Sequence, residues 1–127
     1  MRSWDSAFQV RTVGARTIPV AALVISGTAT GSAQTFYTCG ARGLTRMGVT
    51  HVRNTTATAA TLTFHAIPTG GSIGDSTELL PLFNVPANTT LRIDGLLGDA
   101  FYPSTVFQVF SGTGSALMIW GTVEEVE

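Results

Sequence analysis

The chain has 127 residues, of which 44% are hydrophobic and only 12% are charged, and its formal net charge is −1. This length suits one domain with a buried core, and the high apolar share excludes a disordered acidic or basic chain and a charged coiled coil. The single cysteine, Cys39, excludes an intramolecular disulfide framework and a multi-cysteine metal site. The longest apolar stretch, 20–25, is far shorter than the roughly 20 residues of a membrane span, so no membrane partner is expected.

The charges are sorted along the chain. Residues 1–53 hold six arginines and one aspartate, a net charge of +5, whereas residues 54–127 hold one arginine and seven acidic residues, a net charge of −6. The arginines form no cluster and lysine is absent from the sequence, so a nucleic-acid surface is not expected. Such sorting indicates complementary surfaces that join copies of the chain to one another or to a partner.

The first 19 residues alternate only weakly between apolar and polar side chains. They predict an N-terminal arm, 1–19, in front of a β-sandwich domain, 20–127. The arm places apolar anchors beside cations, and its candidate partner-binding residues are Arg2, Trp4, Phe8, Arg11 and Arg16. An export signal fits this region poorly because Trp4 and Asp5 lie in its leading part and Pro19 interrupts its apolar part; a strand over 20–27 is predicted instead.

From residue 20 onward the apolar residues recur with a period of two. The clearest case is 58–67, where Ala60, Leu62, Phe64 and Ala66 alternate with threonine and histidine. Eight strands are predicted, together with a short helical turn within 95–101: 20–27, 35–39, 49–53, 58–67, 78–85, 89–94, 105–111 and 116–124. They predict an all-β fold, a single antiparallel β-sandwich of about eight strands resembling a jelly roll.

The predicted core takes alternate positions of these strands, so that Thr63 is expected to face solvent. Its members are Leu23, Ile25, Phe36, Val49, Leu62, Phe64, Leu82, Leu91, Phe107, Val109, Met118 and Trp120.

Residues that could carry chemistry are few. His51 and His65 lie in alternating strands without a ligand at metal-site spacing, so both are interpreted as structural, and Cys39 is interpreted as a small buried hydrophobe. The loop 70–75 lacks the lysine of a phosphate-binding loop and is interpreted as a flexible turn. The carboxylates are interpreted as solvated loop residues: Asp75, Glu78, Asp94 and Asp99. We therefore expect no enzyme, cofactor or metal site.

The order of elements over 36–126 resembles a known protein family. Phe36-Tyr37-Thr38, a strand ending in Asn54-Thr55-Thr56, and an alternating strand ending in Pro68-Thr69-Gly70-Gly71 follow one another. Then come Val85-Pro86-Ala87-Asn88 and a closing Gly121-Thr122-Val123-Glu124. This order is similar to that of small β-sandwich virion proteins of tailed bacteriophages. Cys39-Gly40 stand where valine-proline is usual in that family, and residues 1–35 have no counterpart in it.

The resemblance implies a non-enzymatic structural protein of the virion, assembled in the host cytoplasm. The leading hypothesis is a capsid decoration or cement protein that binds the assembled shell as a homo-oligomer, with a trimer favoured. Its partners would be the major capsid protein or tail and neck proteins. A tail, neck or fibre adaptor is the alternative, and a carbohydrate-binding β-sandwich is the alternative from another class.

Overall fold

The structure is a computed structural model that describes residues 15–126. These residues form nine β-strands and three single-turn 3-10 helices. The strands are β1 (Ala15–Ile25), β2 (Gln34–Thr38), β3 (Leu44–Asn54), β4 (Ala60–Ile67), β5 (Glu78–Val85), β6 (Thr90–Arg92), β7 (Ala100–Phe101), β8 (Val106–Ser111) and β9 (Leu117–Val126). The 3-10 helices are η1 (Thr30–Ser32), η2 (Asp75–Thr77) and η3 (Asp94–Leu96).

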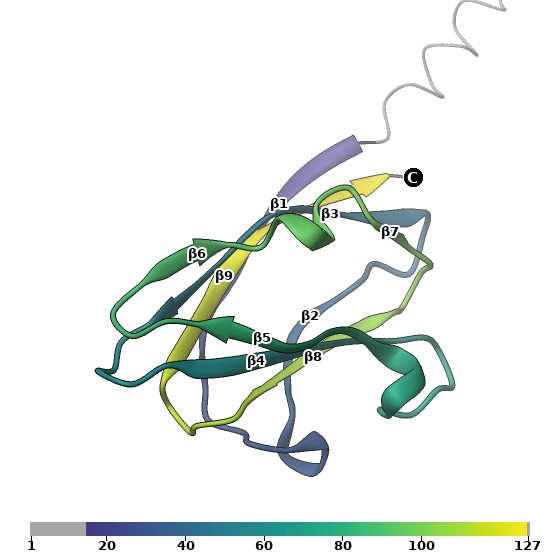
Figure 1. Cartoon of the computed structure of the whole chain (residues 1–127). Helices are drawn as coiled ribbons and strands as arrows, with labels where there is room; N and C mark the ends of the chain where they lie inside the picture. The colour runs from purple at the N-terminus through teal and green to yellow at the C-terminus, as the bar shows by residue number, and fades with distance from the viewer. Residues whose placement is uncertain (1–14, 127) are drawn as a thin grey trace, which may run out of the picture.

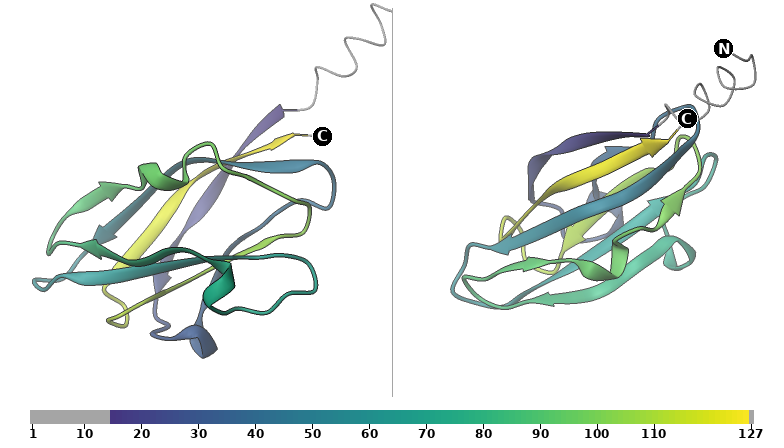
Figure 2. Two further views of the ribbon diagram at one scale, coloured as in Figure 1. Left: turned by 45° about the vertical axis from the view of Figure 1, so that its right-hand side comes forward. Right: turned by 90° about the horizontal axis from the view of Figure 1, so that it is seen from above.

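The strands form two antiparallel sheets that lie one above the other (Figures 1 and 2). Sheet A has the order β1-β9-β3-β6, with β7 also paired to β3, and sheet B has the order β2-β8-β4-β5. The expected all-β fold is confirmed, and each of the eight predicted strands overlaps an observed one. The expected helical turn occurs at η3, one residue earlier than predicted. None of the helices in the described part of the chain is long and apolar enough to cross a membrane.

The core lies between the sheets and takes side chains from both. Phe64 of β4 is fully buried, and its ring lies 6.1 Å from that of Phe36 and 5.6 Å from that of Phe107. Of the predicted core residues, Leu23 and Leu91 are partly buried against this cluster. The buried ones are Ile25, Phe36, Leu62, Phe64, Phe107 and Val109.

The prediction of which β9 side chains face the core was wrong. Leu117 and Ile119 are buried between the sheets, whereas Met118 and Trp120 lie on the outer face of sheet A and are half-buried. Because 117–120 are four consecutive apolar residues, the sequence carries no alternation there. The pairing of Ile119 with Leu23 and Val52 sets which side faces the core.

The prediction of which β3 side chains face the core was also wrong, because Thr50 and Val52 are buried and Val49 is not. The β3–β9 register shifts between Met47 and Thr50. Gly121 permits this shift, because a Cβ at that position would stand 2.3 Å from the Val49 carbonyl oxygen. The backbone contact between Gly121 and Val49, which are far apart in the sequence, thus determines which β3 side chains face the core.

Two predictions about sheet B were wrong as well. Leu82, predicted in the core, is 69% exposed, because it follows Pro81 and has a φ of 48° at an irregularity in β5. Thr63, predicted to face solvent, is only 3% exposed. It lies on the outer side of the sheet with His65, opposite Phe110 of β8, so this side of β4 is also covered.

Each long edge strand carries a proline beside a register irregularity. Pro19 lies in β1, whose pairing shifts between Val20 and Leu23, and Pro81 lies in β5 beside Leu82. A proline cannot donate a ladder hydrogen bond, and a bulge twists the strand away from a flat partner. Extension of either sheet by hydrogen bonding of another molecule to these two strands is therefore not expected.

The predicted boundary at residue 19 falls inside β1, which begins at Ala15. Arg16, predicted in the arm, is therefore part of sheet A. The other candidate residues of the arm, Arg2, Trp4, Phe8 and Arg11, lie outside the described residues.

Candidate interaction surfaces

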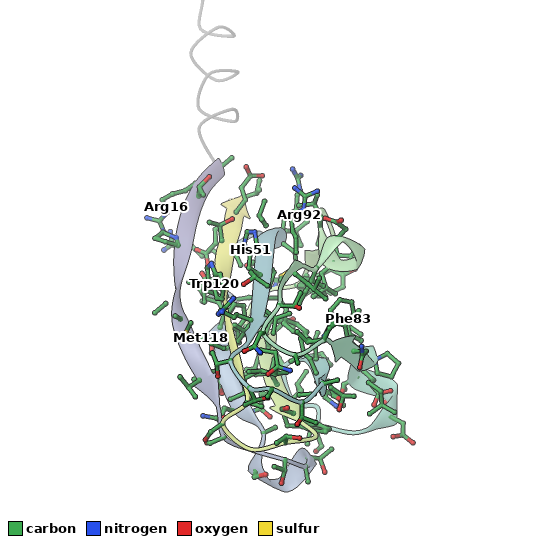
Figure 3. All side chains as sticks on the ribbon, turned by 60° about the vertical axis from the view of Figure 1, so that its left-hand side comes forward. Arg16, His51, Phe83, Arg92, Met118 and Trp120 are labelled. Atoms are coloured by element: carbon green, nitrogen blue, oxygen red, sulfur yellow. The ribbon has the colours of Figure 1, made fainter. Side chains whose placement is uncertain are left out.

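The outer face of sheet A carries an unusual group of side chains, which we call the outer patch: Val24, His51, Arg53, Met118 and Trp120. Strand register places them together, because Met118 pairs with both Val24 and Arg53, and Trp120 pairs with His51. Figure 3 shows Met118, Trp120 and His51 on neighbouring strands of this sheet. Val24 is 54% exposed, and the other four side chains are partly exposed. An apolar and aromatic group in this position indicates an interaction surface.

Stacking and hydrogen bonds hold the outer patch in shape. The rings of His51 and Trp120 lie 5.6 Å apart with an angle of 16° between their planes. Arg53 donates from Nη1 to Thr90 Oγ1 at 3.0 Å, and it forms no ion pair with any residue in 15–126. The patch therefore offers a cation beside a flat apolar surface, which suits a partner surface with a carboxylate near apolar side chains.

The second surface is a cleft between the sheets, which we call the side cleft. It has a volume of about 410 Å³ and opens between β7 on one side and the end of β4 with η2 on the other. Its walls are mostly apolar, and Tyr102 beside it is 78% exposed. The lining residues are Ala66, Pro68, Ser76, Thr77, Leu79, Ala100, Phe101, Tyr102 and Thr105.

Internal hydrogen bonds fix the walls of the side cleft. Thr105 donates its hydroxyl proton to the Tyr102 carbonyl at 2.9 Å, and Thr77 donates to the Gly74 carbonyl at 2.9 Å. The same Thr77 oxygen lies 2.8 Å from Nδ1 of the buried His65, whose Nε2 has no partner among the described residues. Phe101 packs edge-on against Phe107 at 4.9 Å, which ties β7 to the core. The cleft is thus a preformed feature.

Two exposed carboxylates adjoin the lining of the side cleft in the sequence. Asp75 directly precedes Ser76, and Asp99 directly precedes Ala100, whereas Glu78 pairs with His65 on the outer side of sheet B. Neither Asp75 nor Asp99 is in an ion pair with residues in the described range. Arg92 is the one arginine in 54–127, which contain no lysine, and its Nε donates to Asp94 Oδ1 at 2.6 Å. The cleft therefore favours an apolar ligand that carries positive charge at its margins.

A third polar cluster joins both sheets around Glu125. Tyr37 donates its hydroxyl proton to Glu125, and the Gly40 backbone N–H donates to the same oxygen at 3.0 Å. Gly40 allows this approach, because a Cβ there would stand 2.9 Å from the carboxylate. Burial, followed by the hydrogen bond to Glu125, raises the pKa of Tyr37. Arg16 lies 3.7 Å from Glu125, so this predicted partner-binding residue contacts its own chain.

The candidate residues for chemistry are not brought together. His51 belongs to sheet A and His65 to sheet B. Cys39 is buried, as interpreted from the sequence, and burial raises the pKa of its thiol, which keeps it protonated rather than nucleophilic. Within 15–126, no three histidine, cysteine, aspartate or glutamate residues are placed to hold a metal ion.

Sequence reasoning missed the residues of the side cleft. They come from β4, η2, β5 and β7, which the sequence separates by up to about 40 positions, so only the folded sheets bring them together. Tyr102 carried one usable signal: this large aromatic residue stands directly before Pro103, where a turn is expected.

No protein-family model, curated protein or solved structure matches this chain.

Proposed function

We propose that this chain is a non-enzymatic structural protein of a bacteriophage virion, and that its fold is a jelly roll. The observation that carries the proposal is the strand order. With β7 set aside, eight strands remain, four in each sheet, in the orders β1-β9-β3-β6 and β2-β8-β4-β5. This order corresponds to two interleaved Greek keys, the arrangement of jelly rolls, which are frequent in viral capsid proteins.

Fold alone does not determine function, so the surfaces must carry the rest of the argument. The outer patch and the side cleft are both partly apolar. Both lie on a chain whose charge-free tracts, 17–41, 54–74 and 100–123, cover most of its length. A protein kept apart from its neighbours by charge repulsion would not be built in this way. The same features serve a protein that is held between copies and against a shell.

Within the virion, a capsid decoration or cement protein that binds the assembled shell as a homo-oligomer is the first choice, with a trimer favoured. The outer patch is suited to the shell contact because it spans three neighbouring strands, β1, β9 and β3, whose pairing fixes the positions of its residues. The side cleft remains available for contact between copies. A tail, neck or fibre adaptor uses the same surfaces on a different part of the particle.

The test uses particles from the phage or prophage that encodes this chain, with the gene deleted, and purified full-length protein added back. The protein should sediment with these particles saturably, and Trp120→Ala should weaken the binding. A matched control is Phe110→Ala, which removes a half-buried aromatic side chain from the outer face of sheet B. If the added protein stays at the top of the gradient and sediments neither with head-containing nor with tail-containing particles, the proposal is contradicted.

A carbohydrate-binding sandwich is the second candidate, and the exposed Tyr102 ring beside the cleft favours it, because such rings stack on sugars. The hydroxyl protons of Thr77 and Thr105 are already donated to backbone carbonyls. The cleft therefore has few free donors for sugar hydroxyls, which places this function second.

A further inference from the structure

We infer that the side cleft receives the N-terminal segment, residues 1–14, of a second copy of this chain. The inference rests on the proposed function, because it supplies the contact between neighbouring copies that a decorating oligomer needs. It assigns the cleft one occupant, which is the aromatic and basic portion of that segment.

The chemistry of the segment is complementary to that of the cleft. Residues 1–14 contain Trp4 and Phe8, with Arg2 and Arg11 on either side of them and Asp5 as the one acid. The cleft offers apolar walls and an exposed tyrosine ring, and the carboxylates of Asp75 and Asp99, which adjoin its lining in the sequence, have no ion-pair partner in the described range. Its volume lies within the range of about 300–1,000 Å³ typical of ligand pockets, which accommodates an aromatic side chain.

The place where the segment joins the fold supports an exchange between copies. Ala15 pairs with Val126, Val126 pairs with Leu44, and the next residue of β3, Thr45, pairs with Phe101 beside the cleft. The segment and the cleft therefore lie at the same end of the molecule but at opposite edges of sheet A. Three strand spacings of about 4.8 Å separate them by roughly 14 Å.

This placement predicts a head-to-tail contact. A second copy that packs with its β7 side next to β1 of the first copy brings its cleft close to Ala15. Fourteen residues reach at most about 46–50 Å when extended, so the length of the segment is sufficient. Each copy would thus give its segment at the β1 edge and receive a neighbour's segment at the β7 edge. This is a heterologous interface, which closes into a ring when the rotation between copies permits. Such a ring agrees with the favoured trimer.

The test uses full-length single-cysteine additions under mild oxidation, with the native Cys39 too buried to compete. Protein with Gln9→Cys is mixed with protein carrying Ser76→Cys, a substitution in the cleft. The matched control is Ser26→Cys, also at an exposed serine but beyond the end of β1 that is remote from Ala15. Docking raises the effective concentration, so the mixed disulfide dimer should form at least about tenfold faster with Ser76→Cys than with Ser26→Cys. Adding Tyr102→Ala to the Ser76→Cys protein should abolish the difference, whereas adding Val24→Ala should not.

Two results would overturn the inference. Equal dimer formation with both acceptor positions would show that the segment does not occupy the cleft. A protein with Gln9→Cys and Ser76→Cys in the same chain that oxidises to a closed monomer would show that the segment occupies its own cleft. Loss of the selective cross-link with retained particle binding removes this inference and leaves the proposed function standing. A selective cross-link without particle binding would remove the proposed function and leave the contact between copies standing.

Discussion

Replacement of Phe64 by alanine tests how the two sheets face each other. Phe64 is fully buried, and its ring contacts those of Phe36 and Phe107. Truncation of a buried phenylalanine costs about 3–5 kcal/mol, to which aromatic pairs contribute about 0.5–1.5 kcal/mol each. We expect a loss of about 4 kcal/mol in the free energy of unfolding, a large share of the roughly 5–15 kcal/mol of a typical domain.

Replacement of Trp120 by alanine is the matched comparison. Trp120 is the larger side chain, but it is half-buried on the outer face of sheet A, where it stacks on His51. About 1 kcal/mol of stability should be lost, because the cavity term of a core position is absent.

Urea unfolding followed by far-ultraviolet circular dichroism measures both losses, since this signal reports mainly on the backbone and the midpoint is read from each variant's own transition. The Phe64→Ala protein should unfold at a clearly lower urea concentration than the Trp120→Ala protein. If the two variants lose the same stability, or if Trp120→Ala loses more, the assignment of inner and outer faces is wrong.

Three further predictions concern polar contacts and backbone. Asn54 is buried, and its side chain makes four hydrogen bonds, to Thr56, Thr58 and Val85. Asn54→Ala should therefore lower the free energy of unfolding, measured in urea, by about 3 kcal/mol. The control Asn84→Ala, at an exposed position, should change it very little. The raised pKa of Tyr37 means that the unfolded chain loses this proton first, so stability should fall as the pH rises above about 10. Tyr37→Phe should flatten that decline in thermal melts. Gly121→Ala should destabilise by about 2 kcal/mol or more, because its Cβ meets the Val49 carbonyl, whereas Gly31→Ala has open space and should be near neutral.

Each of these predictions has a clear contradictory outcome. Equal losses for Asn54→Ala and Asn84→Ala would remove the role given to the buried amide. An unchanged alkaline decline in Tyr37→Phe would assign that decline to another group. A neutral Gly121→Ala would mean that the shifted β3–β9 register is not required.

The sequence predicted the strands well wherever apolar and polar residues alternate. The stretch 58–67 is such a case, and β4 lies within it. The prediction of which side chains face the core failed where alternation is absent or broken, as in the apolar run 117–120 and at the β3 bulge around Val49, opposite Gly121. In these places the partner strand decides which side is buried, and a single strand does not carry that information.

The candidate surfaces were less accessible to prediction than the fold. The predicted binding residue Arg16 contacts Glu125 of its own chain, a pairing that depends on the β1–β9 register. Tyr102 and Thr77, which line the side cleft, come from segments that meet only after both sheets have formed. Local pattern therefore predicted the strands, whereas the surfaces depend on contacts between residues far apart in the sequence.

The most direct test of the central claim is mass-spectrometric quantification of this chain in gradient-purified particles of the phage or prophage that encodes it. The proposed function predicts that the chain copurifies through successive gradients in a fixed ratio to the major capsid protein. A copy number comparable with that of the capsid protein indicates a decoration protein, and a much smaller fixed number indicates an adaptor of the tail or neck. A chain that is abundant in the lysate but absent from the purified particles would contradict the account.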